Sequence, residues 1–94
     1  MGKYRSRTEI VYQILATAKE IDGVNKTRIM FKSYLSFAQL KEYLKLLIDS
    51  ELLEYDPEGN TYRTTDKGVK MLEACRAINH LVQSGAPADK QRNS

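Results

Sequence analysis

The signals that start two helices lie close together in the middle of this chain, at Asn25 and at Ser36. Each of these side chains can accept a hydrogen bond from a backbone amide in the first turn of a following helix. The segment after Asn25 therefore holds only a short helix, which we expect to end near Ser33-Tyr34. About three residues remain for the turn before the next helix begins, so the two helices are closely joined.

A capping box precedes the first predicted helix, because the Ser6 hydroxyl and the Glu9 carboxylate can each satisfy a backbone amide of the other residue. Apolar residues then recur at three- and four-residue spacing as far as Ile21. Gly23 can take the left-handed conformation that often follows a helix. We therefore predict a first helix over residues 7–22.

A second capping box, formed by Ser36 and Gln39, opens the most regular helix of the chain. We predict this helix over residues 37–50, and we expect Phe31 to be among the apolar residues of the short helix before it. Three leucines recur on one face of the longer helix: Leu40, Leu44 and Leu47.

The hydrophobic period changes after this helix. Residues 52–55 and 61–64 are short segments with β-branched and aromatic side chains, and residues 56–60 read Asp-Pro-Glu-Gly-Asn between them. This pattern predicts a β-hairpin closed by a type I turn with a bulge, in which Gly59 takes the left-handed conformation.

The order of these elements predicts an α+β fold that is mainly α, namely a winged helix-turn-helix with three helices, a β-hairpin wing and a C-terminal helix. Another α+β arrangement of three helices and a hairpin is the alternative. We predict a basic arm over residues 1–6, a DNA-binding domain over 7–65, a terminal helix over 66–84 capped by Thr65, and a disordered tail over 85–94.

The composition argues against several classes of protein. One cysteine, Cys75, and one histidine, His80, cannot build an intrachain disulfide, a cysteine metal site or the usual nucleophile–base pair. No apolar run approaches the roughly 20 residues of a membrane span, and no signal-peptide core follows the basic N-terminus. We therefore expect a cytoplasmic protein that is not an enzyme, with no metal, no cofactor, no membrane contact and no evident small-molecule ligand.

Positive charge is concentrated in the first half of the chain. Residues 1–48 hold nine Lys and Arg against four acids, which gives +5, whereas residues 49–94 hold six against eight, which gives −2, and the two add to the formal +3. A basic first half is typical of a surface that contacts phosphates. A set of solvated lysines without a partner is the alternative.

The segments 25–55 and 62–72 resemble the archaeal winged helix-turn-helix family of small transcriptional regulators and chromatin-associated DNA-binding proteins. The matching positions are Lys26-Thr27-Arg28-Ile29-Met30, Leu35-Ser36, Gln39-Leu40, Tyr43-Leu44, Tyr62, Thr65 and Gly68. The resemblance implies double-stranded DNA as the partner, and homodimerisation through the terminal helix. Two features depart from the family: the terminal helix is short, and the wing tip is acidic.

The helix over 37–50 is the predicted reader of the major groove. Its leucine face is internal, so Ala38, Lys41 and Lys45 point outward. Ser36 lies at the amino end, where helix amides favour a phosphate oxygen, and the Gln39 amide could recognise adenine. Ala38 is small enough for close approach to base edges or for contact with a thymine methyl. Each lysine could instead belong to a solvated helix face.

Further candidate contacts lie outside that helix. Lys26, Thr27 and Arg28 start the short helix and are expected to contact the DNA backbone. Arg63 on the returning strand could reach a phosphate or the minor groove, or it could pair with Glu54 across the hairpin. The basic arm, with Lys3, Arg5 and Arg7, could follow the backbone or be a plain basic terminus.

The terminal helix carries a second apolar row in addition to the one expected to pack on its own domain. Met71, Cys75, Ile78 and Val82 are spaced by four, three and four residues, as in a heptad seam. We predict a homodimer through this row. The rival expectation is a helix that folds back and buries both rows within one chain.

Two functions remain open at this stage. The first is a DNA-binding protein, either a transcriptional regulator or a chromatin-associated protein. The second is a winged-helix module that binds a protein partner instead of DNA, and the acidic wing favours it.

Overall fold

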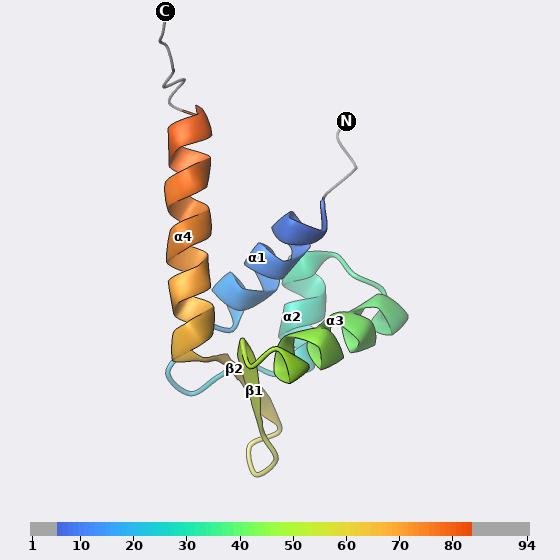
Figure 1. Ribbon diagram of the computed structural model, residues 1–94. Coiled ribbons are helices and arrows are strands. Elements are labelled where there is room, and N and C mark those ends of the chain that lie inside the picture. Colours follow the sequence, from blue (N-terminus) through green and yellow to red (C-terminus); the bar gives the residue numbers. More distant parts are fainter. Residues whose placement is uncertain (1–5, 84–94) are drawn as a thin grey trace, which may run out of the picture.

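The computed structural model describes residues 6–83, and the side chains of residues 6–78 among them. The mainly helical fold with a two-stranded antiparallel sheet is confirmed (Figure 1). The elements are α1 (Arg7–Thr17), α2 (Lys26–Ser33), α3 (Phe37–Asp49), β1 (Leu53–Asp56), β2 (Thr61–Thr64) and α4 (Asp66–Gln83). The predicted arm, except for its last residue, and the predicted tail lie outside the described residues. None of the described helices is long and apolar enough to cross a membrane.

Helix α1 is shorter than its apolar spacing predicts, since it ends at Thr17 with Ala18 as its C-cap. The reason is tertiary. The end of β2 takes the last carbonyls of the helix, because Thr64 donates its hydroxyl to Leu15 O at 2.7 Å and its amide to Ala18 O at 3.1 Å. The expectation that the apolar stripe continues to Ile21 is wrong, because that side chain is 86% exposed in the turn after the helix.

The residues before α2 add a third, very short strand position that the sequence analysis does not include. Val24 donates its amide to Tyr62 O at 2.8 Å and accepts from the Tyr62 amide at 2.7 Å. Gly23 has the expected positive φ of 76°, but it belongs to this turn and does not cap α1. A Cβ at position 23 would lie 2.9 Å from Tyr62 O, so only glycine fits there without displacement.

The two helices of the helix-turn-helix begin where the sequence predicts. Asn25 Oδ1 accepts from the Arg28 amide at 2.8 Å, and the capping box of Ser36 and Gln39 is formed. Helix α2 ends at Ser33, and its C-cap Tyr34 has a left-handed φ of 55°. Because α2 and α3 are this close in sequence, the turn conformation sets the angle at which α3 leaves the domain.

Strands β1 and β2 form the wing, with Leu53 opposite Thr64 and Tyr55 opposite Tyr62. The rings of the two tyrosines lie 4.8 Å apart between centroids. In the connecting turn the left-handed residue is Asn60, with φ 56°, and not the predicted Gly59. Asparagine tolerates this conformation because its short polar side chain can bond locally, and here its Oδ1 accepts from the Tyr55 hydroxyl at 2.7 Å.

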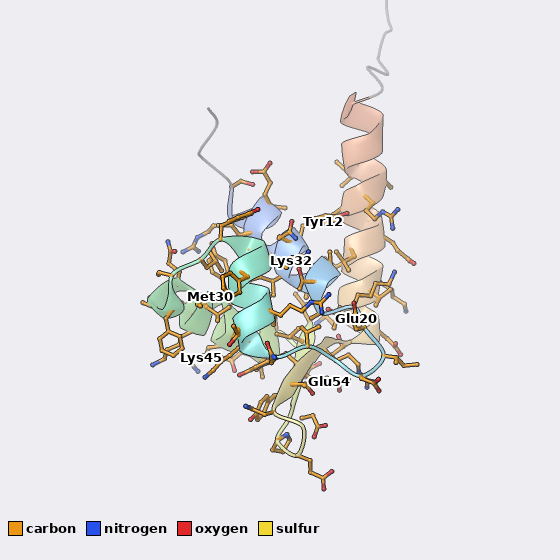
Figure 2. All side chains as sticks on the ribbon, turned by 180° about the vertical axis from the view of Figure 1, so that it is seen from behind. Tyr12, Glu20, Met30, Lys32, Lys45 and Glu54 are labelled. Atoms are coloured by element: carbon orange, nitrogen blue, oxygen red, sulfur yellow. The ribbon has the colours of Figure 1, made fainter. Side chains whose placement is uncertain are left out.

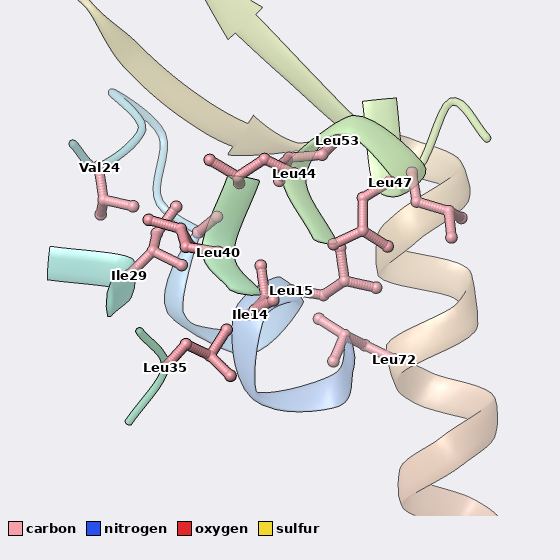
Figure 3. Packing of buried hydrophobic residues seen from close by; sticks show 12 residues of the cluster. Ile14, Leu15, Val24, Ile29, Leu35, Leu40, Leu44, Leu47, Leu53 and Leu72 are labelled. Carbon is pink, nitrogen blue, oxygen red and sulfur yellow. The ribbon is translucent and has the colours of Figure 1, made fainter. Parts of the chain in front are cut away.

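The core lies where α1, α3 and the base of the wing meet, and α4 closes it from one side (Figure 3). Helix α1 contributes Ile14 and Leu15, and α4 contributes Leu72. The predicted inner face of α3 is confirmed, since its leucines at positions 40, 44 and 47 are all buried. The other buried apolar residues are Ala18, Val24, Ile29, Leu35, Leu52 and Leu53.

Helix α4 is attached at its first turn and extends past the end of α1 (Figure 1). Thr65 caps it as predicted, because its hydroxyl oxygen accepts from the Gly68 amide at 3.0 Å. The same hydroxyl donates to Glu51 O at 2.7 Å, and Lys67 donates to Ser50 O at 3.1 Å. These bonds join the start of α4 to the end of α3.

Candidate nucleic-acid interface

The outward face of α3 contains the residues predicted for the major groove. Ala38, Lys41 and Lys45 are all exposed. Two acidic residues lie on the same helix. Glu42 is exposed, and Asp49 forms an ion pair with Lys45, with 3.2 Å between Lys45 Nζ and Asp49 Oδ2. The two lysines are thus balanced by two carboxylates, and this helix alone does not supply the positive charge of a DNA-binding surface.

The positive charge is gathered where α2 and α3 meet, around a residue that the sequence analysis does not assign to the site. The ring of Phe37 is about half exposed, with Lys26 Nζ at 5.3 Å and Lys41 Nζ at 5.7 Å from its centroid. An aromatic face attracts ammonium groups at this range. Phe37 therefore brings together a lysine from each helix, and the spacing of Phe37 and Lys41, one helical turn, was the available signal.

Ser36 and Gln39 are tied to each other by the capping box. Ser36 Oγ accepts from the Gln39 amide at 3.2 Å, and Gln39 Oε1 accepts from the Ser36 amide at 3.0 Å. The Gln39 oxygen that a bidentate contact to adenine needs is therefore already used once. The Nε2 amide makes no hydrogen bond within residues 6–78 and is the group left to contact a base.

The amino-terminal turn of α2 presents Lys26, Thr27 and Arg28, all three exposed. The helix carries a further cation, Lys32, in its last turn and has no acidic residue along its length. Figure 2 shows this helix in front of α1 and α3, with Lys32 at the surface. Lys26 thus belongs both to this turn and to the pair of lysines at Phe37.

Arg63 makes the cross-strand pair that was one of its two expected roles. Its Nε donates to Glu54 Oε2 at 2.8 Å, and its Nη1 donates to Ile21 O at 3.3 Å. Hydrogen bonding to Glu54 raises the pKa of the Arg63 guanidinium above its ordinary value. Since the exposed wing tip adds Asp56 and Glu58, the wing offers no excess positive charge to a phosphate.

The second row of α4 is partly open to solvent. Met71 is 40% and Ile78 is 62% exposed, whereas Cys75 is partly buried. The side chain of Val82 lies outside the described residues. An apolar hollow between α1 and α4 is lined in part by Tyr12, Met71 and Cys75. The rival expectation of a helix that buries both rows within one chain is therefore wrong for Met71 and Ile78.

Comparisons with known proteins agree with the fold. The fold resembles that of Sso10a-2, a DNA-binding protein from Sulfolobus solfataricus, with 20% identity and a TM-score of 0.58, over 90% of this chain and 100% of that one. A comparison with curated protein sequences finds no match. The family model for the winged helix-turn-helix matches residues 4–83. The chain therefore belongs to the winged helix-turn-helix family.

Proposed function

We propose that the protein binds double-stranded DNA, with α3 in the major groove and the first turn of α2 against the sugar-phosphate backbone. The observation that carries this proposal is the position of the Lys26 and Lys41 ammonium groups on the Phe37 ring at the amino end of α3. A helix-turn-helix inserts that end of its second helix toward the bases. The two lysines would then face the phosphates on the edge of the groove.

The amino end of α3 adds its own attraction for a phosphate. The capping box uses the Gln39 amide, and no hydrogen bond within residues 6–78 uses the amides of Phe37 and Ala38. Unpaired amides and the helix dipole favour an anion at such an end. A phosphate placed there would also lie near the two lysines, so the three features reinforce one another.

In the proposed complex, the contacts to bases come from Ala38, Gln39 and Lys45. Ala38 permits close approach, and Gln39 donates from Nε2. Lys45 first has to leave Asp49, but the pair is exposed and costs at most about 1 kcal/mol to separate. The cost is small, so the ion pair does not prevent Lys45 from contacting a base.

The same surface fits either a transcriptional regulator or a chromatin-associated protein, and neither role needs catalytic residues. A selection from random duplexes distinguishes the two. Recovery of one preferred sequence indicates a regulator, and recovery of none indicates an architectural role.

The test of DNA binding is the salt dependence of affinity for Lys26→Ala/Lys41→Ala. In a plot of the logarithm of the binding constant against the logarithm of the salt concentration, each phosphate contact contributes about −0.9 to the slope. The slope of the double variant should therefore be shallower by the contribution of two contacts. Lys19→Ala/Lys70→Ala removes the same charge at two exposed positions outside the proposed interface and serves as the matched control. Equal slopes for the two double variants would place the interface elsewhere.

A protein-binding module is the second candidate, and the acidic wing tip at Asp56 and Glu58 favours it. That function requires no affinity for duplex DNA. Absence of binding at low salt, where phosphate contacts are strongest, would select it.

We also propose that two copies pair through the second apolar row of α4, of which Met71 and Ile78 are exposed. The hollow between α1 and α4 gives this row a place to receive apolar side chains of the second copy. The seam is only about two heptads long, so added contacts to α1 are needed for a stable pair.

A further inference from the structure

Two large aromatic side chains stand exposed at the end of α2, away from the residues proposed to hold duplex DNA. Phe31 is 72% and Tyr34 is 85% exposed. Phe31 does not contribute to the core, because Ile29 and Ser33 occupy the buried side of this short helix. A contiguous exposed apolar patch rimmed by polar residues marks a site of interaction.

The backbone keeps these two aromatic residues close to each other. Tyr34 has the left-handed φ of 55° and donates its amide to Phe31 O at 3.4 Å and to Met30 O. A non-glycine residue in this conformation is held by its surroundings. The turn between α2 and α3 therefore fixes the backbone at Tyr34.

The charged side chains of α2 itself have one sign. Arg28 precedes Phe31 by about one turn, Lys32 follows it directly, and both are exposed. Helix α2 has no acidic residue. Pairing this face with the same face of a second copy would bring like charges together, which opposes self-association. The surface is suited to a polyanion that also offers flat apolar surfaces.

Unpaired bases on a phosphate backbone meet both requirements. In a duplex the base faces are covered by stacking, whereas in a single strand they are open to aromatic side chains. We propose that the outer face of α2, formed by Arg28, Phe31, Lys32 and Tyr34, binds single-stranded nucleic acid. The two rings stack on bases and the two cations contact the phosphates between them.

This face shares Arg28 with the duplex site, because Arg28 lies in the first turn of α2. The aromatic residues separate the two proposals: the duplex site uses Phe37 with Lys26 and Lys41, and neither Phe31 nor Tyr34 takes part in it. The test therefore changes Phe31 and Tyr34 and leaves Arg28 in place.

The test compares an oligothymidine strand of about 20 nucleotides with a duplex of the same length, by fluorescence anisotropy. Phe31→Ala/Tyr34→Ala should weaken strand binding by about 10- to 100-fold, since each stacked base contributes strongly to affinity, and should change duplex binding less than about twofold. Ile21→Ala removes an exposed apolar side chain elsewhere and should leave strand binding unchanged. Thermal melts of the variants confirm that they are folded.

A direct signal is available because the chain contains no tryptophan. In Phe31→Trp, a base stacked on the new ring should quench its fluorescence when oligothymidine is added, and inorganic phosphate should not. The proposal is overturned by a wild type that does not bind the strand, or by equal losses for strand and duplex in the double variant. It is also overturned if the wild type self-associates through this face and the double variant only becomes monomeric, with strand binding intact.

Discussion

Gly68 in the first turn of α4 lies directly against the carbonyl of Leu52, at the end of the connection between α3 and the wing. A Cβ at position 68 would overlap that carbonyl oxygen and lie 2.5 Å from Thr64 Cγ2. The contact explains why glycine, a poor helix former, stands in the first turn of a helix. It also determines how closely α4 approaches the domain.

Gly68→Ala should therefore destabilise the fold by about 1–3 kcal/mol, although alanine is favoured over glycine in a helix. Urea unfolding measures the change. Gly59→Ala is the matched control, because a Cβ there meets the flexible end of Asp56 at 3.2 Å and should cost little. If the two variants are equally stable, α4 is not packed on Leu52 as the structure has it.

Gln39→Ala should weaken binding to a preferred duplex site by about 1–3 kcal/mol and change binding to random duplex little. The physical reason is loss of the Nε2 donor. Ser36→Ala is the control for helix stability, because it breaks the same capping box but keeps the side-chain amide of Gln39. Equal losses on both duplexes would identify Gln39 as a backbone contact.

Ile78→Glu should convert a dimer to a monomer, since it places a charge in the middle of the second apolar row of α4. Sedimentation equilibrium at a protein concentration on the order of tens of micromolar measures the oligomeric state. Ala77→Glu adds the same charge at the neighbouring exposed position and should leave the dimer intact. A monomeric wild type, or a dimeric Ile78→Glu variant, contradicts the pairing.

Because of Tyr62, we expect the protein to lose stability at high pH. Burial, and then the nearby Tyr55, raise the pKa of Tyr62 above its ordinary 10.0, so the folded state favours the protonated hydroxyl. Its contribution is present below about pH 10 and is lost as the pH rises through the folded pKa. Urea unfolding between about pH 8 and pH 11 should show a steeper decline for the wild type than for Tyr62→Phe. Parallel declines would show that Tyr62 titrates as in the unfolded chain.

The helix starts were readable from the sequence, because a cap is a contact between residues three positions apart. Asn25, Ser36 and Thr65 were predicted as caps, and each accepts from a backbone amide in the first turn of the helix that follows it. The inner face of α3 was readable for a similar reason, since Leu40, Leu44 and Leu47 recur on one side of the helix at three- and four-residue spacing. The fold class follows from these local signals taken in order.

The candidate site was readable only in part. The exposed lysines of α3 and the first turn of α2 were predicted, but the residue that joins them, Phe37, was not. Lys26 and Phe37 belong to different helices, and their contact depends on the angle at the turn. The choice between the two roles of Arg63 likewise needed the hairpin register that sets Glu54 opposite it.

The end of α1 shows the same division between local and tertiary causes. Its capping box and apolar spacing were enough to predict where the helix begins, but the apolar residue at position 21 extended the pattern too far. The carbonyls of Leu15 and Ala18 bond to Thr64, a residue more than forty positions away. The sequence by itself determined the contacts between residues a few positions apart. The tertiary structure decided the contacts between distant segments, because only the assembled core brings the donors and acceptors of those segments within reach of each other.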